Sequence, residues 1–215
     1  MAFDYAFVTK VFASLFAIMN PIANIPVFLS LTEGAPIEVQ RRVAVLAAAC
    51  TGFGCLMTVV AGRAILDVFG IGVDDFRLAG GLLVLLIALS MLHGVDSPTH
   101  AVASRAQAAT PDPSSVAIYP LTIPLLVGPG TIAALVVFAD AARARGRWAE
   151  LAVGLCAFLL LVTAALAAAP TIGRHLSASA TAVTRRLMGM ILAAVAMEMI
   201  ADALRALFPV LAQAR

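Results

Sequence analysis

Six strongly apolar runs of similar length follow one another along the chain. They lie at residues 11–31, 43–62, 78–92, 116–139, 151–172 and 187–208. The first five contain no charged residue, and the last contains acidic and basic residues in its interior. A helix needs about 20 apolar residues to cross a hydrocarbon core. No run alternates as a barrel strand would, and Ala, Leu and Met dominate. The pattern therefore predicts an all-α membrane protein with six transmembrane helices.

The composition also indicates that most of the chain lies within a lipid bilayer. Hydrophobic residues make up 62% and charged residues 12% of the 215 residues, which is too little charge to cover a soluble domain. The net charge of +2, without a basic run, does not indicate nucleic-acid binding. Cys50, Cys55 and Cys156 lie inside apolar runs and are interpreted as packing residues. No cofactor or metal site is predicted.

The chain resembles itself at a shift of about 108 residues. Asn20-Pro21 then falls on Gly128-Pro129, and the Arg77-Leu-x-Gly motif falls on the Arg186-Leu-x-Gly motif. A polar linker at about 94–115 separates the two halves, so we predict three-helix repeats at 1–105 and 106–215 within one membrane domain. An odd number of spans makes the second repeat enter the membrane from the opposite side, as in many secondary transporters.

The first and fourth spans are predicted to be broken near their middle. Asn is a favoured N-cap and Pro is favoured at the first helical position, so Asn20-Pro21 indicates a helix that stops and restarts. Gly128-Pro129 gives the same indication in the fourth span. The alternative is that these prolines only kink packed helices, as prolines in membrane helices do.

A restarted helix exposes unpaired N–H groups and the positive end of its dipole, which suits a small anionic group such as a carboxylate. The freed carbonyls and nearby amide and hydroxyl groups suit an ammonium group. Inverted symmetry can bring the two breaks together near the membrane midplane. The residues predicted to bind a small-molecule solute are Asn20, Pro21, Ile22, Ala23, Asn24, Gly128, Pro129, Gly130 and Thr131.

Glu198 is an ionisable residue well inside the sixth run, where a charge is costly and usually functional. We predict that it couples transport to a proton or sodium gradient or contacts the solute. The alternative is a structural role, in which it pairs with polar backbone at the broken helices or extends outward. Asp202 and Arg205 follow at helical spacing and are expected to pair with each other.

The stretches 20–32 and 119–133, which contain the Asn20-Pro21 and Gly128-Pro129 motifs, resemble the two signature stretches of the MarC/SnatA family. The third and sixth spans fit the same family. The resemblance implies a six-span protein of the bacterial inner membrane with inverted three-helix repeats. It also implies transport of small neutral amino acids such as glycine and alanine. Relatives often carry a carboxylate at the position of Ser90 and an amide near that of Glu198, so polar contacts there are expected to differ.

These observations predict a secondary transporter of small neutral amino acids or similar solutes. The alternative is a channel, a facilitator or an exporter of another small solute, because paired half-helices also line selective pores. An enzyme is not expected, since the spans hold no Ser/His/Asp set or paired acid and base. Arginines are balanced between the two sides, so the charges leave the orientation open. Assembly into homo-oligomers is left open as well.

Overall fold

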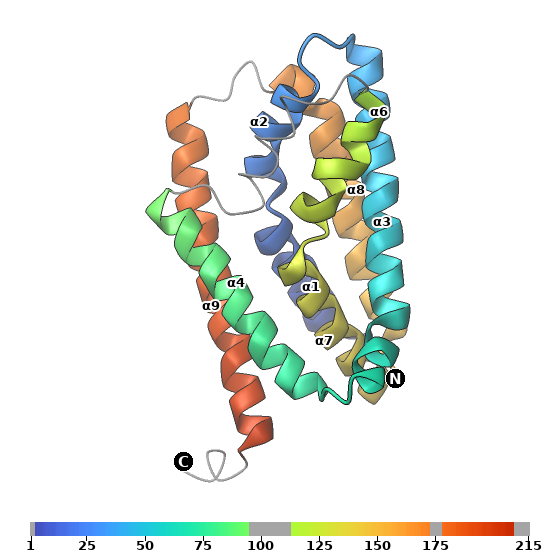
Figure 1. The fold of residues 1–215 in the computed structure, drawn as a ribbon, viewed down its shortest axis with the longest axis vertical. Helices are drawn as coiled ribbons and strands as arrows, with labels where there is room; N and C mark the ends of the chain where they lie inside the picture. The colour runs from blue at the N-terminus through green and yellow to red at the C-terminus, as the bar shows by residue number, and fades with distance from the viewer. Residues whose placement is uncertain (1–2, 95–112, 173–177, 209–215) are drawn as a thin grey trace.

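The computed structural model describes residues 3–94, 113–172 and 178–208 and is drawn in Figure 1. The linker predicted at 94–115 lies outside these ranges except for its two ends. Helices account for nearly all of the described residues, and no strand occurs among them. The elements are α1 (Tyr5–Met19), α2 (Pro21–Leu31), α3 (Ile37–Val68), α4 (Val73–His93), α6 (Pro113–Val116), η1 (Ala117–Leu126), α7 (Pro129–Arg145), α8 (Trp148–Ile172) and α9 (Ala178–Leu207).

The helices account for the six predicted spans. Helices α3, α4, α8 and α9 are each long and apolar enough to cross a membrane. Two further spans are bent pairs: α1 and α2 meet at 41°, and η1 and α7 meet at 63°. Successive spans alternate in direction, so α1 begins and α9 ends at the same end of the molecule (Figure 1). The prediction of an all-α membrane protein is confirmed.

The outer faces of the spans carry large apolar side chains. Phe53 on α3 is 64% exposed and Leu160 on α8 is 71% exposed, and Leu86 on α4 and Met190 on α9 are exposed as well. Such surfaces are unfavourable in water but match lipid tails. These faces therefore fit a chain surrounded by hydrocarbon.

Several helices begin before the apolar runs do. Asp74 and Asp75, which precede the apolar run at 78–92, lie in the first turn of α4. Carboxylates there are favoured by the positive end of the helix dipole, and Asp74 also pairs with Arg77 at 2.8 Å. Lys10, which precedes the apolar run at 11–31, lies inside α1. Hydropathy alone places these polar turns outside the spans, whereas capping and ion pairing extend the helices.

The start of α1 is fixed to the start of α8. The Asp4 carboxylate accepts a hydrogen bond from the Phe7 N–H at 3.0 Å and so caps α1. It also pairs with Arg147, just before α8. Gly146 ends α7 with φ of 67°, a left-handed conformation that glycine adopts without penalty. One carboxylate therefore caps a helix and joins two spans that are distant in sequence.

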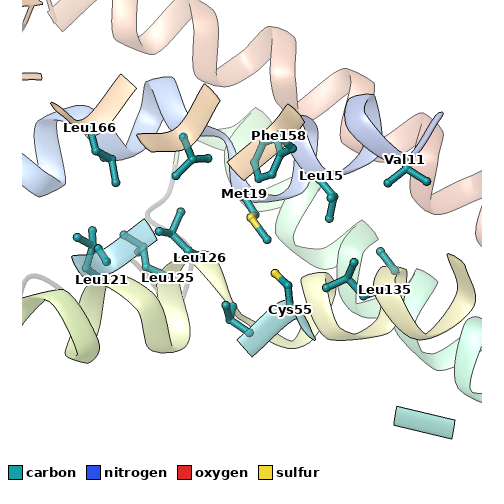
Figure 2. Packing of buried hydrophobic residues seen from close by; sticks show 14 of the residues in the cluster. Val11, Leu15, Met19, Cys55, Leu121, Leu125, Leu126, Leu135, Phe158 and Leu166 are labelled. Atoms are coloured by element: carbon teal, nitrogen blue, oxygen red, sulfur yellow. The ribbon is translucent and has the colours of Figure 1, made fainter. Parts of the chain in front are cut away.

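Four of the spans form one body, which we call the core bundle: α1–α2, α3, η1–α7 and α8. Their buried apolar side chains form a single cluster. Figure 2 shows part of it, with Leu15 and Met19 of α1, Leu126 of η1, Leu135 of α7 and Phe158 of α8. All five side chains are at most 1% exposed. The core bundle therefore contains the first two spans of each predicted repeat.

The remaining two spans, α4 and α9, pack against each other along their length and stand at one side of the core bundle (Figure 1). Glycines bring the two backbones close. A Cβ on Gly81 would lie 3.2 Å from the Ala196 carbonyl oxygen, and one on Gly189 would lie 3.1 Å from the Ala88 carbonyl oxygen. Small residues at such crossings maximise van der Waals contact in lipid. This α4–α9 pair joins the third spans of the two predicted repeats, whose boundaries themselves stay a prediction.

Gly80 makes the closest helix crossing between the α4–α9 pair and the core bundle, because a Cβ there would overlap with the Cβ of Ala133 on α7. We expect Gly80→Ala to destabilise the fold by about 1–3 kcal/mol, the usual cost of overpacking. Thermal unfolding of the detergent-purified protein measures this. Gly52→Ala is the control, since its Cβ would meet only the flexible end of Leu159 at 3.3 Å. Equal melting temperatures for the two variants would contradict the expectation.

Candidate functional site at the helix breaks

The first break lies at Asn20, which has a left-handed backbone with φ of 37° and ψ of 73°. Its side-chain Oδ1 accepts a hydrogen bond from the Ala23 N–H at 3.2 Å and so caps α2. Pro21 occupies the first position of α2, where its missing N–H costs nothing. The predicted stop and restart at Asn20-Pro21 is therefore present in the structure.

The second break is more extensive than the sequence predicted. Gly128 caps α7 and Pro129 begins it, as expected, and a Cβ on Gly128 would lie 2.6 Å from the Pro124 carbonyl oxygen. Beyond that break, η1 is itself irregular: Tyr119 and Ile123 are extended inside it. Each precedes a proline, and the residue before a proline avoids the helical region. The fourth span is consequently unwound over a longer stretch than a single Gly-Pro step.

Side chains close both breaks in the same way. The Asn24 Nδ2 donates to the Met19 carbonyl oxygen at 2.7 Å, and the Thr131 Oγ1 donates to the Leu126 carbonyl oxygen at 2.8 Å. Each bond spans five residues across its break. A carbonyl that loses its helical partner inside a membrane has no bulk water to turn to. Asn24 and Thr131 supply the missing donors.

The two breaks meet at one small cavity of about 40 Å³. It lies where the core bundle faces the α4–α9 pair, and both kinds of element contribute to its wall. The lining residues are Ile18, Met19, Asn20, Ala23, Asn24, Ile87, Met91, Pro124, Leu125, Gly128, Pro129, Gly130, Thr131 and Arg185.

The structure thus brings together most of the residues predicted to bind solute. Pro21 and Ile22 are the exceptions and do not line the cavity. They stand in the first turn of α2, where proline has no N–H to offer and Ile22 is half-buried. Their predicted role as solute contacts remains a prediction, as does that of the residues in the wall.

Two polar atoms at the first break have no hydrogen-bond partner among the described residues: the Asn20 Nδ2 and the Asn24 Oδ1. Asn20 is 4% exposed and Asn24 is 2% exposed. An unpaired buried polar atom costs about 1–3 kcal/mol, so native proteins keep one only where something compensates. One atom is a donor and the other an acceptor, and both belong to side chains in the cavity wall.

The wall also contains three residues that the sequence did not predict: Ile87, Met91 and Arg185. Arg185 precedes the sixth apolar run at 187–208. Helix α9, however, begins at Ala178, which places Arg185 two turns inside the helix, half-buried at the cavity. Ile87 and Met91 carry no signal beyond ordinary apolar periodicity.

Glu198 lies away from both breaks. Its Oε1 pairs with the Lys10 Nζ at 2.8 Å, and its side chain is 53% exposed. Its partner is a side chain of α1, so the alternative that it pairs with polar backbone at the helix breaks is not observed. Arg205 and Asp202 do pair, at 3.3 Å, as expected from their spacing. The contact of Lys10 with α9 was not predicted from the sequence.

The fold and this cavity define a class: an all-helical, multi-pass integral membrane protein with two discontinuous spans that meet inside the bundle. Comparison with protein families shows which family within that class the chain belongs to. Residues 5–208 match the model of the MarC family integral membrane proteins, and the chain belongs to the MarC family.

Relatives of similar length occur in bacteria and archaea. The UPF0056 membrane protein YvbG of Bacillus subtilis is 33% identical, over 96% of this chain and 98% of its own. The UPF0056 membrane protein YhcE of Escherichia coli is 30% identical, over 96% of both chains. A UPF0056 membrane protein of Archaeoglobus fulgidus is 30% identical, over 90% of both chains. No solved structure matches the chain.

Asn20 combines a helix cap with a left-handed backbone, and the two contributions can be separated. We expect Asn20→Gly to lose the cap but keep the backbone, whereas Asn20→Ala also strains the backbone by roughly 1–2 kcal/mol. Asn20→Ala should therefore have the lower melting temperature in detergent. Equal melting temperatures would show that the left-handed conformation does not limit stability at this position.

Proposed function

We propose that this chain is a secondary transporter of small neutral amino acids, or of solutes of the same size and charge, in the bacterial inner membrane. The observation that carries the proposal is the convergence of both helix breaks on one small cavity between the core bundle and the α4–α9 pair. Discontinuous helices that meet in this way form the solute sites of many secondary transporters. Membership of an integral membrane family over nearly the full chain supports the location in a membrane that such a role requires.

The polar groups of the cavity suit a zwitterion. The first turn of α7 presents the N–H groups of Gly130 and Thr131 to the cavity at the positive end of its helix dipole, and Arg185 adds a guanidinium to the wall. In the first turn of α2 the Ala23 N–H is already bonded to Asn20, so that helix contributes the field of its dipole. These groups favour a carboxylate. The unpaired Asn24 Oδ1 is an acceptor and favours an ammonium group. A solute that carries a carboxylate and an ammonium group on the same carbon would satisfy both the donors and the acceptor of the wall.

The size of the cavity limits the solute. By the same measure a water molecule needs about 10–15 Å³, so the cavity holds on the order of three waters. Ala23, Gly128 and Gly130 keep the wall free of large side chains. Glycine and alanine are the amino acids that fit with the least movement of Ile87 and Met91. Larger side chains would have to displace the α4–α9 pair.

The proposed transport movement takes place between the core bundle and the α4–α9 pair. The core bundle has one large buried apolar cluster, and a smaller cluster joins α4 to α9 and takes in Ala17 of α1 at the boundary, where the cavity also lies. Packed clusters move as units because interiors are dense and deform little. Rocking of the pair against the core bundle would expose the cavity to one side and then to the other. The boundary therefore does not follow the division into the two predicted repeats.

Glu198 is the proposed coupling residue. It pairs with Lys10 across the boundary between the pair and the core bundle. Arg77 from α4, Arg145 from α7 and Arg205 from α9 line the same pocket. Protonation of Glu198 would remove the attraction to Lys10 and so loosen the contact between α1 and α9. A bound proton would in this way favour one arrangement of the two bodies.

The test of the function is uptake of labelled glycine and alanine into liposomes that contain the purified protein. We expect saturable uptake, reduced roughly 10–100-fold by Asn24→Leu, which removes the unpaired acceptor and the bond to the Met19 carbonyl. Gln40→Leu is the matched control, since it removes an amide that bonds only near the α2–α3 turn. No uptake above empty liposomes would overturn the proposal, and uptake that never saturates would indicate a channel.

The coupling role has its own test. We expect uptake by the unaltered protein to increase with an inward proton or sodium gradient, and Glu198→Gln to remain active without responding to that gradient. Glu38→Gln, on the exposed first turn of α3, is the control. Unchanged gradient dependence in Glu198→Gln would exclude this residue as the coupling site, whatever the solute.

A further inference from the structure

A second, larger cavity lies outside the site at the helix breaks. It has a volume of about 510 Å³ and is lined by both apolar and charged side chains, among them Phe138, Lys10, Arg145 and Glu198. These residues belong to the part of the bundle where α1 begins and α7 and α9 end (Figure 1). We call it the terminal vestibule, and the side of the membrane that it faces the terminal side.

The same spans line the terminal vestibule and the break cavity, in a matching order along each helix. On α1, Lys10 lines the vestibule and Ile18 lines the break cavity. On α4, which runs in the same direction, Arg77 lines the vestibule and Ile87 lines the break cavity.

The two spans that run in the opposite direction show the reverse order. On α7, Thr131 lines the break cavity and Ala141 lines the vestibule. On α9, Arg185 lines the break cavity and Glu198 lines the vestibule. Four helices thus pass from one cavity to the other, so the two cavities lie on a common axis between the core bundle and the α4–α9 pair.

A thin apolar layer separates the two cavities. It consists of Ala17 on α1, Val84 on α4 and Ala196 on α9, each at most 1% exposed and all in one cluster. In sequence Ala17 and Val84 lie between the vestibule and break-cavity residues of their helices, and Ala196 directly follows Val195, the vestibule residue of α9 that is nearest in sequence to Arg185. Val84 closes the layer against α7, because a Cβ on Gly130 would lie 3.2 Å from the Val84 Cγ2. We call these three residues the constriction.

We propose that the terminal vestibule is the terminal-side half of the solute path and that the constriction is its closed gate. The proposal rests on the proposed transport function and adds the route by which solute reaches the breaks. Apolar constrictions close pores by excluding water. Small residues at Ala17 and Ala196 leave Val84 as the side chain that fills the gap, so a slight separation of the two bodies is enough to open it.

The ion pair between Lys10 and Glu198 crosses the same boundary on the vestibule side of the constriction. Lys10 belongs to the core bundle and Glu198 to the α4–α9 pair. The other charged groups that line the vestibule with Glu198 and Lys10 are Arg77, Arg145, Asp202 and Arg205. Loss of this ion pair removes one attraction that holds the gate closed. The coupling residue and the gate are therefore parts of one mechanism.

Cysteine accessibility tests the path without any solute. The background replaces Cys50, Cys55 and Cys156, and reporters are introduced singly as Ala141→Cys in the vestibule and Ile87→Cys at the break cavity. A charged, membrane-impermeant methanethiosulfonate is applied to spheroplasts and to inverted membrane vesicles. The preparation in which Ala141→Cys reacts defines the terminal side. From that side we expect Ile87→Cys to react at least about tenfold more slowly, because an opened gate is a minor state.

Val84→Ala then tests the gate, since it removes the two methyl groups that fill the constriction. We expect it to raise the reaction rate of Ile87→Cys from the terminal side about tenfold, close to that of Ala141→Cys. Val162→Ala is the matched control, because Val162 is equally buried but belongs to α8 in the core bundle. Equal rates for the two reporters without Val84→Ala, or an equal effect of the two valine substitutions, would overturn the proposal.

The outcome is distinguishable from a failure of the proposed function. If glycine and alanine are not taken up but the labelling follows the expected pattern, the path exists and serves another solute. If uptake is saturable but the labelling does not follow the pattern, the transport function stands and the path through the vestibule is wrong.

Discussion

The need to pair backbone hydrogen bonds inside a membrane shapes this molecule more than any other constraint. Prolines interrupt the first and fourth spans, and each interruption leaves carbonyls that lipid cannot satisfy. Asn24 and Thr131 answer this with donors to the Met19 and Leu126 carbonyls, each five residues back. Both side chains are buried, so the breaks bring polar groups into the interior of the bundle. The cavity lies at the breaks because these polar groups line it.

The same constraint explains why the breaks lie at the boundary between two bodies. Continuous helices such as α3 and α8 satisfy their own backbone and can pack on any face. An interrupted helix has polar atoms that must avoid lipid, so it needs protein on that side. The core bundle covers one side of each break, and the α4–α9 pair supplies Ile87, Met91 and Arg185 on the other. The pair therefore shields the breaks and forms part of the cavity wall.

Much of the fold could be predicted because hydropathy and proline chemistry are local. Six apolar runs gave the spans, and Asn20-Pro21 and Gly128-Pro129 gave both breaks. The contacts that could not be predicted are those between residues far apart in the sequence. The Lys10–Glu198 and Asp4–Arg147 ion pairs join residues over 140 positions apart, and no local spacing indicates such pairs. The irregular winding at Tyr119 and Ile123 was not predicted either, although its cause is local: each residue precedes a proline and so avoids the helical region.

The pairing of α4 with α9 has a consequence for the order of synthesis. The chain is made from its N-terminus, so α4 enters the bilayer long before residues 178–207 exist. Until then the face around Gly81 has no helix to receive it, and α4 is held mainly by its contacts with α7. The α4–α9 pair can assemble only once the final span has been made. A ribosome that stalls before α9 leaves the first break without Arg185 and α4 without its principal partner.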